Sequence, residues 1–183
     1  MNNYEDIEIL APCGSFASLQ AAINAGADSV YFGASRLNMR AASSVNFNIN
    51  DLKEIISKAK EKNIKTYLTL NTIMYDEDLS EAEEIILKAK EDGIDAIIAS
   101  DFSIIELCNK YNVRTHISTQ ANISNIGAVR FFAKYADVMV LARELTLDQV
   151  ANIINKINQE KIIGPNGELI KIEIFVHGAL CMA

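Results

Sequence analysis

The sequence predicts an α/β fold of the parallel (β/α) barrel type, in which strands and helices alternate along the chain. An eight-residue helical segment at 54–61 recurs thirty positions later at 84–91, and a β-rich run follows each copy. A unit of that length suits a TIM-like barrel, in which roughly 250 residues are divided among eight units. Parallel neighbours also need a crossover connection, and a helix provides a compact one.

Seven runs of apolar and β-branched residues are the candidate strands, and helical patterns lie between them. They are residues 7–11, 29–32, 65–70, 96–99, 115–119, 138–141 and 171–176. An open doubly wound sheet is the alternative fold. Its glycine-rich phosphate fingerprint is absent after the first strand, where the sequence at 11–15 is Ala-Pro-Cys-Gly-Ser. We therefore expect seven of eight barrel units in one truncated domain over residues 1–183, with the last unit beyond the chain end.

Capping signals mark the ends of the helices between these strands. The predicted N-caps are Ser15, Ser80 and Thr146, of which the last two have the spacing of a capping box with Glu83 and Gln149. Gly26 and Gly93 stand where two helices should stop. These positions leave short connections between helices and strands, as parallel α/β folds require.

Composition limits the class of protein. Half of the 183 residues are hydrophobic, which is enough for one sizeable core, and no apolar run approaches the roughly 18 residues of a membrane span. A formal net charge of −7 argues against a general nucleic-acid-binding surface, although a local basic site could still exist. Three widely spaced cysteines without a secretory signal imply reduced thiols. We expect a soluble, cytoplasmic protein.

Polar residues follow the candidate strands where each strand ends, which is where β/α barrels build their sites. They are Asn71, Ser100, Asp101, Ser118, Thr119, Gln120, Arg143, Glu144 and His177. Alternation along the last strand puts Phe175 and His177 on one face, so His177 is expected to point into the barrel mouth. The same alternation places His116 deeper, where a hydrogen-bonded core role is expected.

Arginines near these ends are candidates for binding an anion. Arg143, and Arg36 or Arg40 in the long connection at 34–48, could each form a bidentate pair with a carboxylate. An arginine beside Glu144 could equally pair with an acidic neighbour. The connection itself is expected to be either a binding loop or a disordered lid.

Proteolysis would need an activated nucleophile, a metal-bound water or a pair of acids. The sequence has no His-Glu-x-x-His, no Gly-x-Ser-x-Gly and only two histidines. Asp101 and Glu144 are a conceivable acid pair, but carboxylates that lie on the surface or pair with arginine are the more ordinary explanation.

Five segments, in order along the chain, resemble the collagenase-like peptidase family U32. They are Leu-Ala-Pro at 10–12, Asn-Ala-Gly-Ala-Asp-Ser-Val-Tyr-Phe-Gly at 24–33, Ser-Thr-Gln at 118–120, Leu-Ala-Arg-Glu-Leu at 141–145 and Phe-Val-His-Gly-Ala-Leu-Cys at 175–181. The last is the most specific, and together they cover essentially the whole chain. One departure is Cys13, where the family usually has a small residue, so Cys13 is interpreted as an incidental thiol.

The resemblance implies two kinds of activity. The family is named for collagenase-like proteolysis, yet several members resemble iron–sulfur proteins that support hydroxylation of a tRNA or rRNA base, with prephenate as an input, or of a quinone precursor. In such members the cysteine at the position of Cys181 resembles the first of four cluster ligands. Cys108 lies in the apolar phase of its helix, so the resemblance places the other ligands in a cysteine-rich region beyond Ala183.

We therefore expect the N-terminal barrel of an iron–sulfur-dependent RNA hydroxylation protein that uses a prephenate-like anion. A collagenase-like peptidase and a non-catalytic ligand-binding barrel are the alternatives, and this fragment alone is expected to be inactive and to hold no cofactor. The candidate catalytic residues are Glu144, Asp101 and His177, the substrate-binding ones are Arg143, Arg40, Asn71, Gln120 and Ser118, and the metal ligand of the longer protein is Cys181.

The expected partners are a small anionic metabolite or a peptide, with RNA for the full-length protein and no membrane. Self-association is also expected, because the first and seventh strands of an incomplete barrel leave unpaired backbone edges.

Overall fold

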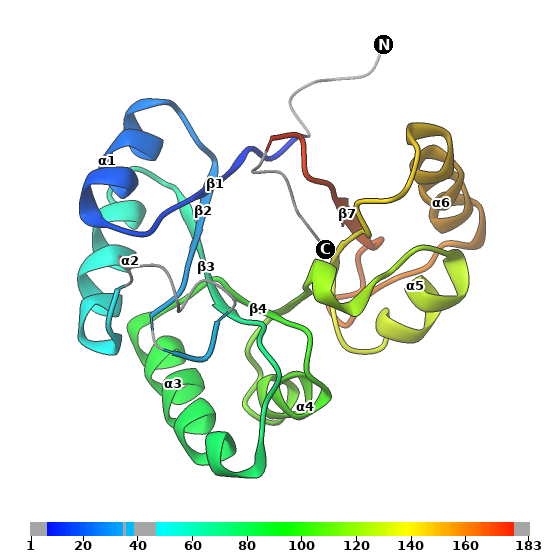
Figure 1. The fold of residues 1–183 in the computed structure, drawn as a ribbon. Helices are drawn as coiled ribbons and strands as arrows, with labels where there is room; N and C mark the ends of the chain where they lie inside the picture. Colours follow the sequence, from blue (N-terminus) through cyan, green and yellow to red (C-terminus); the bar gives the residue numbers. More distant parts are fainter. Residues whose placement is uncertain (1–6, 35, 39–46, 178–183) are drawn as a thin grey trace. The chain divides into compact units, whose positions relative to one another are not determined.

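The computed structural model describes residues 7–34, 36–38 and 47–177. The chain divides into two compact units, residues 1–114 and 115–183. In each unit parallel strands alternate with helices, and the helices lie on one side of the strands (Figure 1).

The first unit contains four parallel strands paired in chain order. They are β1 (Leu10–Pro12), β2 (Ser29–Phe32), β3 (Lys65–Leu70) and β4 (Ala96–Ala99). The helices are α1 (Phe16–Asn24), α2 (Leu52–Lys60), α3 (Leu79–Asp92) and α4 (Phe102–Lys110), with 3₁₀ turns η2 (Ile49–Asp51) and η3 (Asp76–Asp78). In the register of the sheet, Tyr67 lies beside Tyr31 on one side and Ala96 on the other.

The second unit repeats the pattern with three parallel strands. They are β5 (Thr115–Ile117), β6 (Val138–Val140) and β7 (Lys171–Glu173). The helices are α5 (Ile126–Phe132) and α6 (Leu147–Glu160), and the 3₁₀ turn η4 (Thr119–Ala121) follows β5. His116 pairs in register with Val138, and Val140 pairs with Glu173.

The sequential order of the strands confirms the α/β, TIM-barrel-like class. A doubly wound sheet reverses its strand order after the first strand, whereas here β1 to β4 and β5 to β7 each follow one another. In the described part of the chain, every helix is too short or too polar to cross a lipid bilayer. The expected single domain and the missing eighth unit remain predictions.

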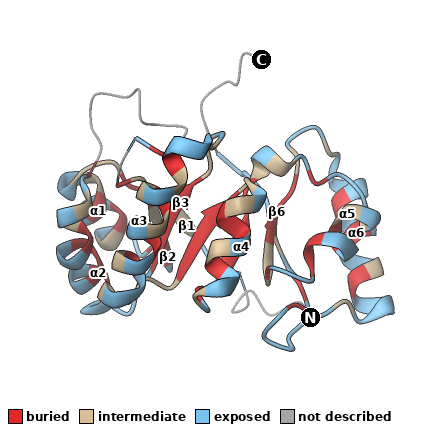
Figure 2. Cartoon of the chain, turned by 90° about the horizontal axis from the view of Figure 1, so that it is seen from below, coloured by how far each residue is buried: buried red, intermediate tan, exposed pale blue. Residues whose placement is uncertain are grey.

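The repeated helical segments bury the faces that their spacing predicts. The buried residues are Leu52, Ile55, Ile56 and Ala59 on α2, and Ala82, Ile85, Ile86 and Ala89 on α3. Figure 2 shows buried residues, in red, on the strands and on the helix faces that cover them. Burial of these aliphatic side chains against the strands stabilises both αβ units by the same contact, which explains why the sequence repeats.

The helix caps agree with the sequence at all but one position. Ser15 caps α1, Thr146 and Gln149 form the capping box of α6, and α3 ends at Gly93 with a left-handed φ of 86°. The predicted N-cap Ser80 is wrong. The turn η3 runs directly into α3, so Ser80 lies inside the helix.

Strands β2, β3 and β4 have the predicted bounds. The other four strands are shorter than predicted, and β1 runs one residue further, to Pro12. β1 starts at Leu10 because the side chains of Ile7 and Ile9 are 64% and 61% exposed, so no burial anchors them. β7 ends at Glu173, and Val176 is 90% exposed. Within the described residues β7 pairs only with β6. The residues after Glu173 therefore have no second neighbouring strand to hold them in the sheet.

The buried centre of the first unit yields a stability prediction. Leu68 is fully buried on β3, where it pairs in register with Phe32 and Ile97. Leu68→Ala should lower the free energy of unfolding by about 2–5 kcal/mol, because it removes buried methyl groups and leaves a cavity. Leu87→Ala on the exposed side of α3 is the control, with an expected change within about 0.5 kcal/mol. Equal losses in urea titrations would contradict this packing.

Candidate functional site

The ends of β6 and β7 bring together two of the predicted site residues, Arg143 and His177, while Glu144 follows Arg143 in the sequence but does not line their pocket. Since Val140 pairs with Glu173, the residues that follow each strand emerge side by side. The Leu141 N–H donates to the Glu173 carbonyl at 3.0 Å, and the Ala142 N–H donates to the Ile123 carbonyl at 2.9 Å. These bonds fix the backbone up to the residue before Arg143.

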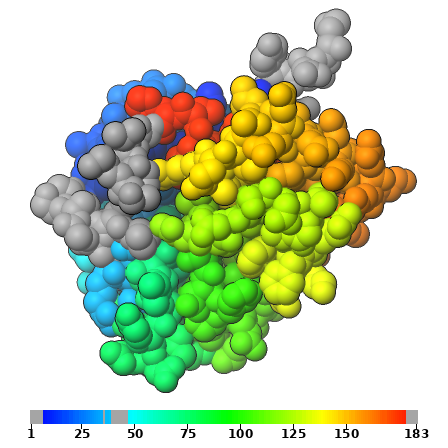
Figure 3. Space-filling model, turned by 45° about the vertical axis from the view of Figure 1, so that its right-hand side comes forward, coloured from blue at the N-terminus to red at the C-terminus, as the bar shows by residue number. Residues whose placement is uncertain are grey.

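A pocket of about 290 Å³ lies at these strand ends. It is lined by Leu141, Ala142, Arg143, Leu145, Leu147, Val150, Ile174, Phe175, Val176 and His177. The segment after β6, in yellow, and the segment after β7, in red, adjoin on the surface in Figure 3. Because the lining is apolar except for Arg143 and His177, it suits an apolar group close to a polar or charged one.

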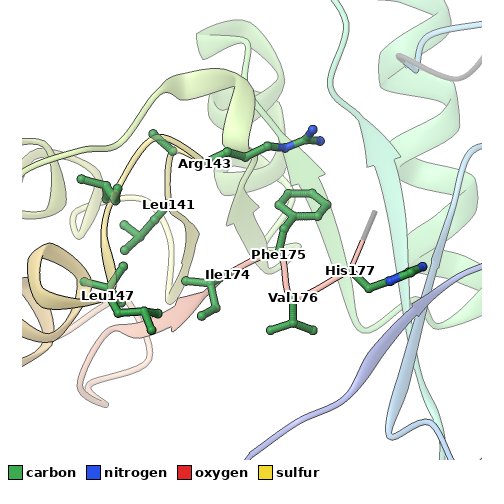
Figure 4. Close-up of a pocket in the computed structure, with 10 residues that line it drawn as sticks. Leu141, Arg143, Leu147, Ile174, Phe175, Val176 and His177 are labelled. Atoms are coloured by element: carbon green, nitrogen blue, oxygen red, sulfur yellow. The ribbon is translucent and has the colours of Figure 1, made fainter. Parts of the chain in front are cut away.

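Arg143 lies over an aromatic ring at this pocket. Its guanidinium carbon is 4.4 Å from the centroid of the Phe175 ring, which is cation–π geometry, and Figure 4 shows the side chain extended across the ring. Within the described residues Arg143 forms no ion pair, so the pairing considered for Glu144 is not seen. The exposed guanidinium therefore keeps its hydrogen-bond donors available to an anion.

His177 lines the same pocket and is exposed. Figure 4 shows its ring directed away from the apolar wall that Leu141, Leu147 and Ile174 form. Phe175 and Val176 point to opposite sides, as strand alternation predicts, although β7 has already ended.

The turn after β5 places Ser118 and Gln120. Ser118 is buried and caps η4, with its hydroxyl accepting from the Gln120 N–H at 3.4 Å, while the Gln120 residue is exposed. Thr119 Oγ1 donates to the Leu141 carbonyl at 3.2 Å and so ties this turn to the end of β6. His116 is 7% exposed, which confirms its predicted buried position.

In the first unit, Asn71 and Asp101 follow β3 and β4. Ser100 Oγ donates to the Asn71 carbonyl at 3.2 Å. Asp101 is the N-cap of α4, where its carboxylate accepts from the Ser103 N–H at 2.9 Å and from the Ser103 hydroxyl at 2.5 Å. Its catalytic role stays a prediction beside this structural one. Arg40 and Cys181 lie outside the described residues.

Arg36 is held by acids of its own chain. Its Nη2 lies 2.6 Å from Asp78 Oδ1 and 3.0 Å from Glu81 Oε2. Ala34, Leu37 and Asn38 beside it are buried, so the described start of the long connection is packed. Most of the segment for which a binding loop or a lid was predicted lies outside the described residues. Arg36 is therefore a less suitable anion clamp than Arg143.

Comparisons with known proteins decide between the family and a chance likeness. A family model described as Peptidase family U32 matches residues 14–183. The chain belongs to peptidase family U32. It is 52% identical to a Porphyromonas gingivalis protein named Collagenase, over 99% of this chain and 44% of that protein. It is 33% identical to tRNA hydroxylation protein P1 of Bacillus subtilis, over 96% of this chain and 40% of that protein.

A solved structure of a U32 peptidase has the same fold. The TM-score is 0.68 over 85% of this chain and 67% of that one, at 12% sequence identity. The curated relatives above are more than twice as long as the part of them that this chain matches. The family relatives of this chain therefore include one protein named Collagenase and one named for tRNA hydroxylation.

Both cysteines within the described residues, Cys13 and Cys108, are buried. Cys13 is 3% exposed and Cys108 is fully buried, and burial raises the pKa of the Cys13 thiol to about 11. In the described ranges, no three His, Cys, Asp or Glu side chains are grouped as metal ligands would be. The described residues therefore do not fit a four-cysteine cluster.

The sequence did not predict two parts of the candidate site. Phe175 was predicted only to lie on one face of a strand, although its ring stacks against the Arg143 guanidinium. Leu147 and Val150, from the first turn of α6, were assigned to no site although they line the pocket. The sequence held one signal, because Leu145 and Leu147 flank the predicted cap Thr146, directly after Arg143 and Glu144. The structure shows that Leu147 is 77% exposed.

The Arg36–Asp78 pair yields a prediction of pH dependence. The Tyr75 N–H, donated at 3.0 Å, and then the Arg36 guanidinium hold the pKa of the Asp78 carboxyl below its ordinary value of 3.8. The folded state thus binds the Asp78 proton more weakly than the unfolded state. The stabilisation is complete well above pH 3.8 and is lost as the pH falls through the lowered folded value.

The Tm difference between wild type and Asp78→Asn should therefore be greatest near neutral pH and shrink on acidification below pH 3.8. Asp76→Asn, in the same turn, is the control. Thermal unfolding followed by circular dichroism at several pH values measures both. A Tm difference for Asp78→Asn that grows as the pH falls would contradict the assigned pairing.

Proposed function

We propose that this chain is the barrel part of a longer, iron–sulfur-dependent protein that supports hydroxylation of a tRNA or rRNA base and binds a prephenate-like anion. The observation that carries the proposal is Arg143. It lies beyond the end of β6, exposed beside an apolar pocket and without an ion-pair partner in the described ranges. That is the edge at which β/α barrels bind their ligands.

The chemistry of Arg143 supports a carboxylate ligand. A guanidinium presents a planar fork of donors that matches a carboxylate in two parallel hydrogen bonds, and prephenate carries two carboxylates. Contact with the Phe175 ring restricts the side chain before the anion arrives, so less conformational entropy is lost on binding. His177, at the same pocket, is the candidate to hydrogen-bond the bound anion.

The relatives support the RNA part of the proposal. A relative that matches nearly all of this chain is named for tRNA hydroxylation. The chain itself has a net charge of −7, so the basic contacts to an RNA backbone would come mainly from the rest of the longer protein. In that protein a cluster would supply redox chemistry, with Cys181 as one ligand. The described residues are assigned only the binding of the anion.

The alternative is a collagenase-like peptidase, which the 52% identical relative named Collagenase favours. Its candidate acids are Asp101 and Glu144. Asp101 already accepts two hydrogen bonds as a helix cap, and Glu144 is exposed. The cap role is a sufficient structural reason for Asp101, so the acid pair rests on the relative's name alone.

The test uses the longer protein that contains this chain, expressed in bacteria from which the native RNA-hydroxylation relative has been deleted. Mass spectrometry of tRNA and rRNA nucleosides should show the hydroxylated base restored by wild type. Arg143→Gln should reduce it at least about tenfold, because the anion loses its charged partner. Arg130→Gln, which removes an arginine paired with Glu160 on the same unit, should leave it unchanged.

Gelatin digestion by the same purified proteins is measured in parallel. Gelatin cleavage lost in Glu144→Gln, with no nucleoside restored, would overturn the proposal in favour of a peptidase. If wild type neither restores the nucleoside nor cleaves gelatin, the proposal is overturned in favour of a non-catalytic binding barrel.

A further inference from the structure

We propose that Asn166 is a deamidation site of this chain, and that the Asp137 carboxylate holds the reaction back while the turn between α6 and β7 is closed. The site lies in the second unit, at the end of the β6–β7 pair opposite to the pocket. It does not depend on the function proposed for Arg143.

The sequence distinguishes Asn166 from the other asparagines. It precedes Gly167, and this is the one Asn-Gly pair in the 183 residues. Asparagine is chemically labile, and a glycine that follows it leaves the backbone nitrogen uncovered because it has no Cβ. Both residues are exposed, so water reaches them. Among the asparagines of the unfolded chain, Asn166 is therefore expected to react first.

The reaction needs only the chain and water. The Gly167 backbone nitrogen attacks Cγ of Asn166, so that a new N–Cγ bond closes a succinimide ring while the Cγ–Nδ2 bond breaks. Ammonia leaves and takes the proton that the Gly167 nitrogen gives up. Water then opens the ring at one of its two carbonyl carbons, and its second proton returns to the nitrogen. The product is aspartate or, when the main chain runs through Cγ, isoaspartate.

The closed turn restrains the side chain that must react. Asn166 Nδ2 donates to Asp137 Oδ2, and the Asn166 backbone N–H donates to Asp137 Oδ1 at 3.1 Å. One carboxylate therefore holds the side chain and the backbone of the same residue. Cγ can approach the Gly167 nitrogen only if the Asn166 side chain changes its rotamer, which breaks the charge-assisted bond from Nδ2.

The closed turn also occupies the attacking nitrogen. The Gly167 N–H donates to the Gly164 carbonyl at 3.0 Å and closes a β-turn with Pro165 in its second position, where the fixed φ of proline is suitable. The nitrogen attacks only after it loses this proton, so the attack gives up this hydrogen bond as well. Both reacting groups are thus engaged as long as the turn stays closed.

The turn lies directly on the start of β6. A Cβ on Gly164 would collide with the Asp137 carboxylate and would lie 3.0 Å from Asp137 Cα, so only glycine permits this approach. The Asp137 carbonyl accepts from the Lys171 N–H, at the first residue of β7, at 2.9 Å. Deamidation would replace the Asn166 Nδ2 donor by a second carboxylate oxygen beside Asp137, and like charges repel. The modification would therefore release the turn where β6 and β7 begin to pair.

The first experiment compares the folded and the unfolded wild-type chain. The whole chain is incubated at neutral pH with and without urea, and peptide mass spectrometry follows deamidation of each asparagine and formation of isoaspartate. In urea, Asn166 should react fastest of all the asparagines. In the folded chain it should react at least about tenfold more slowly than in urea, because the turn must first open. Equal rates for Asn166 in the two conditions, or a faster reaction of another asparagine in urea, would overturn the proposal.

Two variants open the turn by different routes. Asp137→Ala removes the carboxylate, and Gly164→Ala pushes the turn away from Asp137, so each should raise the rate at Asn166 in the folded chain at least about fivefold. Glu168→Gln is the matched control in the same turn and should keep the wild-type rate, because its carboxylate pairs with Lys171 at 3.7 Å and both side chains are exposed. Wild-type rates in both turn variants would refute the role of Asp137. The wild-type comparison decides even if a variant fails to fold.

The effect of the product on the fold is measured with Asn166→Asp. This variant should lower the Tm by about 2–4 °C, because it loses the bond to Asp137 and adds a like charge beside it. Asn155→Asp, at an exposed position within α6, is the control and should leave the Tm unchanged. Equal Tm values for the two variants would contradict the release of the turn.

Discussion

The parallel pairing of β6 with β7 is the constraint on which the candidate site depends. Val140 pairs with Glu173, and the Leu141 N–H closes the ladder on the Glu173 carbonyl at 3.0 Å. From that bond onward the two backbones diverge from a fixed point, one toward Arg143 and the other toward Phe175. A slip of one residue would turn Phe175 to the opposite side and separate it from the guanidinium.

The polar strand ends of the two units differ in how their charges are used. In the first unit the described charges stabilise the fold, since Arg36 bridges Asp78 and Glu81, and Asp101 caps α4. In the second unit Arg143 contacts a ring, and none of the described residues that line its pocket carries a carboxylate. A cation left in that state gains little for the fold and much from an anionic ligand, which is why ligand binding is assigned to the second unit.

Much of the fold follows from local periodicity, whereas the site depends on contacts between segments distant in the sequence. The apolar residues of α2 and α3 recur with the helical period, and β2, β3 and β4 are readable as short runs that are buried almost continuously. Ser80 was misread because η3, which precedes α3, leaves no distinct pattern in the sequence. The pairing of Arg36 with Asp78, 42 positions away, and the stacking of Arg143 on Phe175 depend on which strands become neighbours, which no local pattern encodes.

The most direct test of this account is a double-mutant cycle on Arg143 and Phe175. Its readout is the affinity for 3-phenylpropanoate, a simple carboxylate that stands in for the prephenate-like anion. The variants are Arg143→Gln, Phe175→Leu and the pair, all measured by calorimetry on the whole chain. If the Phe175 ring holds the guanidinium over the pocket, the two single losses should sum to more than the double loss, with a coupling of about 0.5–1 kcal/mol. Strictly additive losses would contradict the account, because Arg143 would then bind the acid independently of the ring.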